Sequence, residues 1–561
     1  MKNFRWQLLI ILLTGIIVGV LLITQQPNSP TNTARPQTGG VYTEGLVGNF
    51  QRLNPLFDHY NQPDRDVNRL IFNGLVKFDL RGVAQPDLAE SWGFSKDGLT
   101  YNFSIRENIT WQDGSPFTVD DIIFTIDKMR DPDSVIPTDL KNFWSDIKLN
   151  RLNEYNIQFI LPEPFSPFLD YLTFGILPEH LLGKNTFREI QESPFNLQPV
   201  GTGPYKIDHL IVENEKITGV VLSANQDYFG EKPFIDQVIF KYFANSSEMY
   251  TAYNEGEIQG ISRVSNEILP EVLGNHDLAT YTGRRPELAM VILNLNDTKV
   301  DFFQDVNVRQ ALMKSINRTI IINQYLHGQA IQADSPIFPG TWAYYNNAPI
   351  TFDPEAAINH LKTAEFIFAG DTDTIRSKAD KKLSFTMIYP DDEIHKNIAE
   401  QIQKDWKGVG VEVKLEPLTY ETIIDDRLVN RNYQAALVDF NLSKYPDPDP
   451  YPFWDQAQAT GGQNYSQWDN RIASEYIEQA RVTTDLAERI RLYHNFQVVF
   501  REEMPALLLY YPVYTYAVST EVKGVQMGSF FDPSDRLENI NTWFLLVKRG
   551  NQLELTPTAG N

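Results

Sequence analysis

The sequence contains no cysteine. This absence excludes disulfide bonds, thiolate metal sites and a cysteine nucleophile. It also excludes attachment to a membrane through a lipid-modified N-terminal cysteine. Any attachment to a membrane must therefore use apolar sequence.

Positive charge is also scarce. The chain has 49 Lys and Arg against 72 Asp and Glu, which gives a formal net charge of −23. A chain this acidic is repelled by nucleic-acid phosphates and by anionic bilayer surfaces. We therefore expect no nucleic-acid partner.

Motifs for catalysis or metal binding are missing or incomplete. No G-x-S-x-G occurs, and the S-x-x-K pattern from Ser145 to Lys148 lacks the S-D-N and K-T-G motifs of a penicillin-recognising site. The eight histidines are scattered, so zinc motifs are absent. In VGTGPYKI, residues 200–207, Lys206 replaces the third glycine of a dinucleotide loop, and we interpret Gly201 and Gly203 as turn residues. We predict no enzyme activity, no metal and no cofactor.

A long apolar run stands near the N-terminus. Lys2 and Arg5 precede LLIILLTGIIVGVLLI, residues 8–23, and the run approaches the ~20 residues that a bilayer requires. A cleaved signal peptide and an uncleaved anchor are both open interpretations. Because no A-x-A cleavage pattern follows, we favour a transmembrane helix over 1–24 that leaves the rest of the chain outside the cytoplasm. Polar residues 25–39 are expected to form a flexible tether.

The rest of the sequence mixes helix and strand patterns. Thr118, with Asp121 three residues later, predicts the start of a helix over 119–129. Alternating apolar residues over 411–415 predict a half-buried strand directly after another helix that Gly408 ends. This second helix has apolar residues at every fourth position, which predicts one buried stripe: Ile394, Ile398, Ile402 and Trp406. Repeated helix and strand units predict an α/β architecture.

One block, residues 86–129, reads PDLAESWGFSKDGLTYNFSIRENITWQDGSPFTVDDIIFTIDKM. It is followed in order by PVGTGPYKI, NQDYFGEKPFIDQVIFKYF, AYNEGEIQ, DVNVRQALMKSINRTIIINQYLHGQA and RNYQAALVDFNLSKYPDPDPYPFW. Together these stretches resemble the family 5 extracytoplasmic solute-binding proteins of ABC importers, which include oligopeptide, dipeptide and nickel binders. The resemblance runs from about residue 40 to about residue 545.

The resemblance implies a two-lobed clamp of the periplasmic-binding-protein type II fold. Lobe I would span 40–287 and carry an extra subdomain with the block at 86–129, lobe II would span 288–515, and 516–549 would return to lobe I before a tail at 550–561. Such clamps close around a ligand by hinge motion, so the crossing segments would be hinges. We assign the aromatic residues of the block to packing: Trp92, Phe94, Tyr101, Phe103 and Trp111.

The resemblance further implies a monomer that captures a peptide or a similar small polar solute and delivers it to ABC permease subunits in the membrane. Two alternatives stay open. One is a peptide-binding sensor or chaperone-like binder without transport, and the other is an oligosaccharide binder. Neighbouring genes for two permease subunits and two ATPases would favour import.

The proline-rich stretch NLSKYPDPDPYPFW, residues 441–454, is expected to line the cleft. In the peptide binders that it resembles, the position of Lys444 is an Asp that takes the ligand's α-ammonium group, so the charge is reversed here. An unpaired lysine in a closed cleft is costly, so either the ligand offers an anionic or strongly accepting group, or Asp439 or Glu44 neutralises the lysine. We therefore expect an acidic or N-blocked peptide, or an oligosaccharide. The predicted ligand contacts are Lys444, Tyr445, Asn441, Trp454, Glu44 and Trp342.

Overall fold

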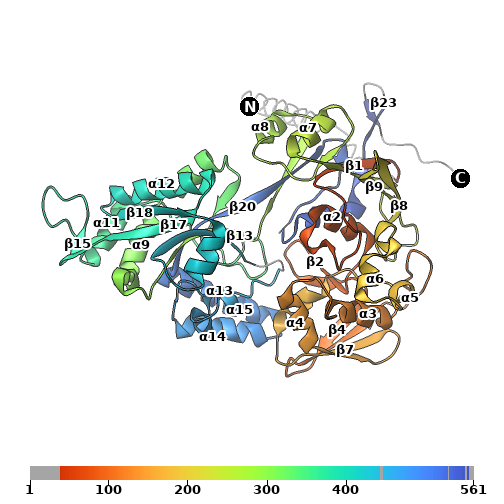
Figure 1. The fold of residues 1–561 in the computed structure, drawn as a ribbon, viewed down its shortest axis with the longest axis horizontal. Helices are drawn as coiled ribbons and strands as arrows, with labels where there is room; N and C mark the ends of the chain where they lie inside the picture. The colour runs from red at the N-terminus through yellow and green to blue at the C-terminus, as the bar shows by residue number, and fades with distance from the viewer. Residues whose placement is uncertain (1–37, 443–445, 529, 550–551, 555–561) are drawn as a thin grey trace, which may run out of the picture.

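The computed structural model describes residues 38–442, 446–528, 530–549 and 552–554. Figure 1 shows two lobes side by side, one red to yellow and one mostly green to blue, with strand β20 (Ala506–Ser519) running between them. The predicted anchor at 1–24 and most of the predicted tether lie outside the described residues. Within these residues, no helix is both long enough and apolar enough to cross a membrane.

Lobe I is built on a mixed sheet in the order β20-β11-β1-β10-β9-β8, with β12 also paired to β20. Strand β1 pairs in parallel with both β10 and β11, which places it in the middle of the sheet. The strands are β1 (Val41–Val47), β8 (Tyr205–Glu213), β9 (Lys216–Ala224), β10 (Gln237–Phe243), β11 (Gly260–Ile261) and β12 (Leu278–Arg284). Its helices include α2 (Gln62–Ile71), α7 (Ser246–Asn254) and α8 (Leu269–Gly274).

The extra subdomain is an antiparallel sheet in the order β4-β5-β7-β6, covered by α3 (Val119–Met129) and α4 (Thr138–Asp146). Thr118 and Asp121 form the capping box that begins α3, as predicted. Tyr101, Phe103 and Trp111 are buried as expected, whereas Phe94 is 47% exposed, so its assignment to packing was wrong. The strands are β4 (Ala89–Phe94), β5 (Thr100–Ile105), β6 (Lys148–Arg151) and β7 (Asn156–Ile160).

Short elements connect the subdomain to the lobe I sheet. They are the hairpin of β2 (Val76–Phe78) and β3 (Ala84–Pro86), the 3-10 helix η2 (Ser166–Leu172), α5 (Glu179–Leu182) and α6 (Phe187–Gln191). After them comes the predicted glycine turn. An added Cβ at Gly201 would lie 1.9 Å from the Ile71 carbonyl oxygen, so close backbone approach requires this glycine.

Lobe II has a five-stranded sheet in the order β18-β17-β19-β13-β20, buried between two hydrophobic clusters. Its strands are β13 (Glu287–Leu293), β14 (Ala330–Gln332), which pairs with β20, β17 (Ser384–Pro390), β18 (Glu412–Leu418) and β19 (Ala435–Asn441). A small hairpin, β15 (Ser377–Lys378) and β16 (Lys381–Lys382), lies apart from this sheet. The helices are α9 (Val306–Lys314), α10 (Arg318–Ile320), α11 (Pro354–Thr363), α12 (Glu393–Gly408), α13 (Tyr451–Trp454), α14 (Arg471–Val482) and α15 (Leu486–Glu503).

Helix α12 and strand β18 confirm the helix and strand predicted around Gly408. The helix ends at Gly408, and β18 follows in parallel with β17. Ile398, Ile402 and Trp406 are fully buried, but Ile394 is 41% exposed. The predicted stripe is therefore one residue too long, because Ile394 lies in the first turn of the helix and outside the hydrophobic cluster.

Two chain crossings join the lobes. The first is the short link between β12 and β13, and the second is β20, which pairs with β13 over 506–510 and with β12 over 513–519. The return segment then packs against lobe I through Trp543. It contains two small two-stranded sheets, β21 (Val522–Lys523) with β22 (Phe544–Leu545), and β23 (Val547–Arg549) with β24 (Gln552–Glu554). The boundaries predicted at 287 and 515 fall close to these crossings and stay predictions.

Candidate ligand-binding cleft

Three neighbouring cavities run between the lobes. We name them the hinge cavity, about 510 Å³, the central cavity, about 240 Å³, and the outer cavity, about 570 Å³. Arg65, Phe531 and Asp532 line both the hinge and the central cavity. His59 and Tyr171 line both the central and the outer cavity. Adjacent cavities share lining residues, so the three lie in a row between the lobes, and we call this row the cleft.

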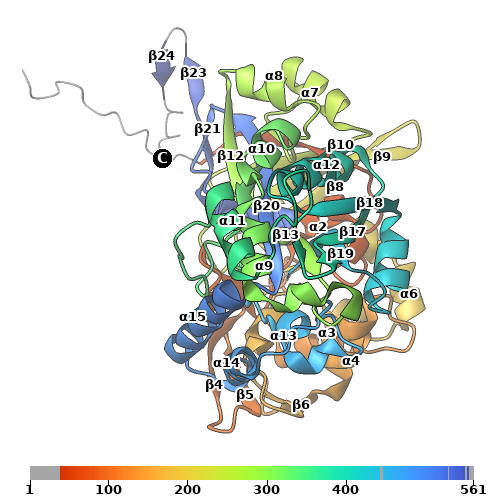
Figure 2. The ribbon, with the colours of Figure 1, turned by 90° about the vertical axis from the view of Figure 1, so that its left-hand side faces the viewer.

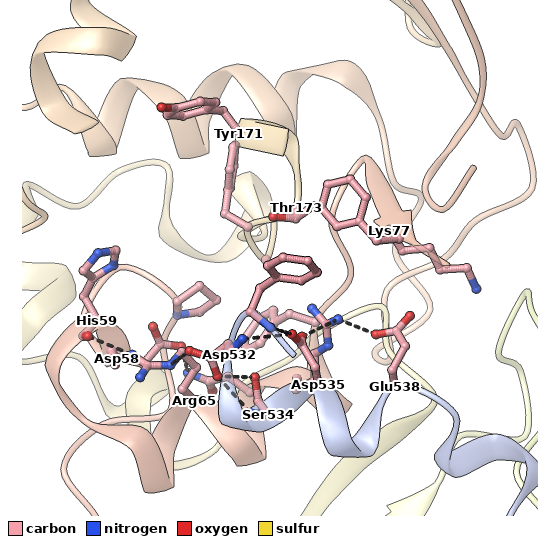
Figure 3. A pocket seen from close by; sticks show the side chains of 18 of the residues that line it. Asp58, His59, Arg65, Lys77, Tyr171, Thr173, Asp532, Ser534, Asp535 and Glu538 are labelled. Carbon is pink, nitrogen blue, oxygen red and sulfur yellow. Dashed lines mark hydrogen bonds and ion pairs between the residues drawn. The ribbon is translucent and has the colours of Figure 1, made fainter. Parts of the chain in front are cut away.

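Both lobes contribute to this cleft. Lobe I supplies helix α2 and the return segment 530–538, which lie against each other along one wall of the central cavity (Figure 3). Lobe II supplies the proline-rich segment, which reaches all three cavities: Asn441 lines the hinge cavity, Pro446 the central cavity, and Pro448 and Phe453 the outer cavity. The described residues on both sides of 443–445 therefore line the cleft, as the sequence predicts.

Ion pairs hold α2 against the return segment. Arg65 Nε lies 2.8 Å from Asp532 Oδ2, and Arg69 pairs with both Asp535 and Glu538. Figure 3 shows these groups along one wall of the central cavity. Burial raises the pKa of the Asp535 carboxyl to about 6, although Arg69 opposes the shift. The wall is therefore a paired network of charges.

The same wall of the central cavity contains the buried carboxyl group of Asp58. Its carboxylate accepts a hydrogen bond of 2.8 Å from Asn68 Nδ2. Burial raises its pKa to about 7, because the hydrogen bond and the charge of Arg65 do not offset the loss of hydration. Asp58 is thus a carboxyl that changes charge near neutral pH.

The proline loop, defined here as residues 446–450, is fixed from behind by lobe II. Asp447 forms an ion pair with Arg489 and accepts a hydrogen bond from Tyr493. Arg481 Nε lies 3.2 Å from Asp449 Oδ2, and burial raises the pKa of Asp449 to about 6. The prolines already have restricted φ angles. The ion pairs of Asp447 and Asp449 further restrict the conformation of the loop.

The same loop also contacts lobe I. The backbone N–H of Asp447 donates to Asp170 of η2 at 2.6 Å, and an added Cβ at Gly82 would lie 2.5 Å from Pro446. Nearby, Ser166 Oγ donates to the Thr483 carbonyl oxygen at 2.6 Å. Figures 1 and 2 both place α14 beside the subdomain. We call this contact region the proline-loop interface. It joins the lobes at a distance from β20.

The structure places the predicted ligand contacts unevenly. Asn441 lines the hinge cavity, while Lys444 and Tyr445 lie outside the described residues. Trp342 and Trp454 are buried, the first beside Arg489 and the second against Phe500. Neither tryptophan lines one of the three cavities, and their roles as ligand contacts stay predictions.

Glu44 is fully buried on β1. Arg536 donates to it from Nε at 2.9 Å and from Nη2 at 2.6 Å, and the same guanidinium donates to both oxygens of Asp66 at 2.9 and 2.7 Å. The hydroxyl groups of Tyr42 and Tyr516 also donate to Glu44. In this structure Glu44 therefore supports the cleft wall from behind.

The sequence analysis did not single out the charged residues of the cleft wall. Arg65 and Asp532 are 467 positions apart in the sequence, so no local spacing connects them. The sequence shows only that a charged residue occurs in an amphipathic helix and another in an acidic return segment. Within the described part of the chain, no group of three or more His, Asp or Glu side chains is arranged to hold a metal ion.

A family model described as bacterial extracellular solute-binding proteins, family 5, middle, matches residues 83–463. The chain belongs to the family 5 bacterial extracellular solute-binding proteins. Family membership confirms the resemblance seen in the sequence, and it places the binding lobes outside the cytoplasm.

Individual relatives agree with this family membership. The chain is 25% identical over 558 residues to the oligopeptide-binding protein AppA of Bacillus subtilis, covering 97% of this chain and 99% of the relative. It is 27% identical over 481 residues to the dipeptide-binding protein of Escherichia coli, covering 81% and 86%. The solved structure of Bacillus subtilis AppA in complex with a nonapeptide matches with a TM-score of 0.61 at 25% identity, covering 91% and 100%. The match confirms the two-lobed α/β fold class of this family 5 protein.

Proposed function

We propose that this chain is the extracytoplasmic substrate-binding component of an ABC importer. It captures a peptide or a similarly sized polar solute by closing its lobes and delivers it to permease subunits. The observation that carries the proposal is the row of three cavities between the lobes, lined by α2 and the return segment of lobe I and by the proline loop of lobe II. Its two larger cavities have the volumes of small-molecule sites.

Peptides are the proposed ligand class. Two relatives with long matches, an oligopeptide-binding protein and a dipeptide-binding protein, support this class. The cleft walls combine paired charges with the aromatic residues Phe453 and Phe531, which suits a chain of mixed polar and apolar side chains.

Lys444 refines this proposal. Two carboxylates that could neutralise it are engaged elsewhere: Asp439 Oδ2 lies 2.9 Å from His395 Nε2, and Glu44 is held by Arg536. We therefore extend the proposal to an acidic or N-blocked peptide whose accepting group meets Lys444. This refinement rests on the sequence, because Lys444 lies outside the described residues.

The proposal includes a single-pass anchor at 1–24, a tether at 25–39 and lobe boundaries near 287 and 515. Its support is the apolar run at 8–23 without a cleavage pattern. N-terminal sequencing of the protein from detergent-solubilised membranes tests the anchor. A mature start between residues 24 and 40 would contradict it.

Ligand capture is tested by native mass spectrometry of the protein purified from its own cells, followed by denaturation and identification of the released molecules. The expected result is one peptide class bound at one molecule per chain. Deleting the gene should then abolish uptake of that peptide, whereas a sensor would bind it without affecting uptake. Release of an oligosaccharide, or of no small molecule from protein that also fails to bind added peptides, would contradict the proposal.

A further inference from the structure

The hinge cavity has an unusual balance of charged groups. Three carboxylates line it, Asp66, Glu287 and Asp532, and each already has an arginine partner. Their partners are Arg536, Arg285 and Arg65 respectively. Among the described residues of the cavity wall, every carboxylate therefore has an ion pair.

Arg263 is a further cation in this cavity wall. It follows β11 in lobe I, lines the hinge cavity and is exposed to solvent. Within the described residues it has no ion pair and no hydrogen bond from its guanidinium. Its charge acts on the neighbouring Arg285 and Glu287, which belong to the first crossing between the lobes. Arg263 therefore presents a positive charge without a direct ion pair at the hinge end of the cleft, with Glu287 as its nearest attractive charge.

Carboxylates behind this wall are engaged as well. Asp439 is bonded to His395, and Glu44 to Arg536 and two tyrosines. Neither of these carboxylates lines the hinge cavity. Neither of them forms an ion pair with Arg263 in this structure.

Neutral hydrogen-bonding groups line the same cavity as Arg263. Ser265 is one of them, and its buried Oγ has no hydrogen-bond partner among the described residues. Ser246 from α7 and Asn441 from lobe II also line the cavity. A cavity that contains a guanidinium together with hydroxyl and amide donors suits a carboxylate, which accepts several hydrogen bonds at once.

Lobe closure would raise the energetic cost of leaving the Arg263 guanidinium without a counter-charge. Closure removes water from the hinge cavity, and an arginine that loses water without gaining a counter-charge is strongly unfavourable. A ligand carboxylate would supply the missing charge, and only the closed state would desolvate the pair. An anionic ligand would then favour closure more than a neutral ligand of the same size.

We propose that the hinge cavity is a carboxylate-binding subsite in which Arg263, assisted by Ser265 and Asn441, holds a carboxylate of the bound ligand. This inference rests on the proposed peptide-binding function and specifies which ligand group enters the hinge end of the cleft. The carboxylate belongs either to the peptide C-terminus or to an acidic side chain, and both sources have the same chemistry at Arg263.

The test is calorimetric titration of the full chain with three randomised nonapeptide pools. One pool has free C-termini and all side chains, the second is C-terminally amidated, and the third has free C-termini but no Asp or Glu. The proteins are the wild type, Arg263→Gln and the matched control Arg188→Gln, whose side chain is 79% exposed and lies away from the cleft lining. Equal melting temperatures of the three proteins establish that each is folded.

Arg263→Gln should weaken binding of the first pool about 10-fold to 100-fold, the range for a hydrogen bond to a charged group. Arg188→Gln should bind like the wild type. If the carboxylate is the peptide C-terminus, the amidated pool should bind the wild type more weakly, and Arg263→Gln should not weaken its binding further. If the carboxylate is an acidic side chain, the pool without Asp and Glu should show these two results instead.

Equal binding of the first pool by the wild type and by Arg263→Gln would overturn the subsite while leaving peptide binding intact. Failure of the wild type to bind any pool would overturn the proposed peptide-binding function, and the subsite with it. The two failures are therefore distinguishable.

Discussion

The backbone N–H of Asp447 in lobe II donates a hydrogen bond of 2.6 Å to the carboxylate of Asp170 in lobe I. Both residues are acidic and both are buried, so this contact brings two carboxylates together at the proline-loop interface. Arg489 compensates Asp447 directly, whereas Asp170 has no ion pair within the described residues. The hydrogen bond favours the charged form of Asp170, but burial and the charge of Asp447 oppose it more strongly and raise the pKa of Asp170.

Asp170→Asn should stabilise the protein at pH 8. The pKa of Asp170 is raised, first by burial and then by the charge of Asp447. Because the folded state binds this proton more tightly than the unfolded state, Asp170 contributes stability that is lost as pH rises through its folded pKa. An asparagine keeps the oxygen acceptor and removes the charge.

Urea unfolding of the wild type and Asp170→Asn at pH 8 and at pH 4 checks this. The variant should have the higher midpoint at pH 8 and nearly the wild-type midpoint at pH 4. Asp139→Asn, an exposed carboxyl in α4, is the control and should change neither value. A lower midpoint of Asp170→Asn at pH 8 would show that the ionised carboxylate is needed at the interface.

Stability of the whole protein should rise as pH falls from 8 to 5. Burial raises the pKa of Asp58 to about 7, and it raises the pKa of Asp64, Asp87, Asp449 and Asp535 to about 6. Each carboxyl binds its proton more tightly when folded, so acidification through these values favours the folded state. Asp532 has a lowered pKa, and its stabilising contribution is lost only at pH values below this window.

Asp58→Asn isolates the largest of these five pKa shifts. The variant should be more stable than the wild type at pH 8, by up to about 4 kcal/mol at 1.36 kcal/mol per pKa unit, and its stability should vary less between pH 5 and pH 8. Urea midpoints measured at half-unit pH steps give both quantities. A wild-type stability that falls steadily from pH 8 to pH 5 would contradict the assignment.

Arg536 should be essential for folding of lobe I. It is fully buried and holds both Glu44 and Asp66. Arg536→Met leaves two buried carboxylates without a counter-charge, and loss of one partner of a buried pair costs about 3–5 kcal/mol. Arg471→Met removes an exposed arginine that pairs with Glu478 and should change stability little, because solvent screens an exposed ion pair.

Thermal and urea unfolding of the two arginine variants, side by side, measure this difference. Comparable stabilities of Arg536→Met and Arg471→Met would mean that the buried cluster contributes little. If Arg536→Met misfolds while Arg471→Met folds normally, the result agrees with the expected role of Arg536 in folding of lobe I.

Local sequence patterns predicted local structure well. The capping box of Thr118 and Asp121, and the helix that ends at Gly408 before β18, depend on residues within a few positions of each other. Ile394 fits the apolar spacing but lies in the first turn of α12, outside the core. Spacing alone does not show where a helix leaves the hydrophobic cluster.

The cleft was less predictable for a related reason. The proline-rich stretch indicated that its segment reaches the cleft, and Asn441 and Pro446 do so. Trp342 and Trp454 look equally suited to a ligand, yet both pack inside lobe II. Arg263 carries no local signal, because its free charge becomes apparent only when every carboxylate around the hinge cavity has been matched with a partner.

Closure of the lobes on a bound ligand is the central claim, and small-angle X-ray scattering tests it most directly. The full chain is measured alone and with a saturating randomised nonapeptide pool, and calorimetry of the same samples establishes binding. We predict a smaller radius of gyration in the presence of the pool, with a higher melting temperature from mass action. Identical scattering profiles with and without bound peptide would contradict the account.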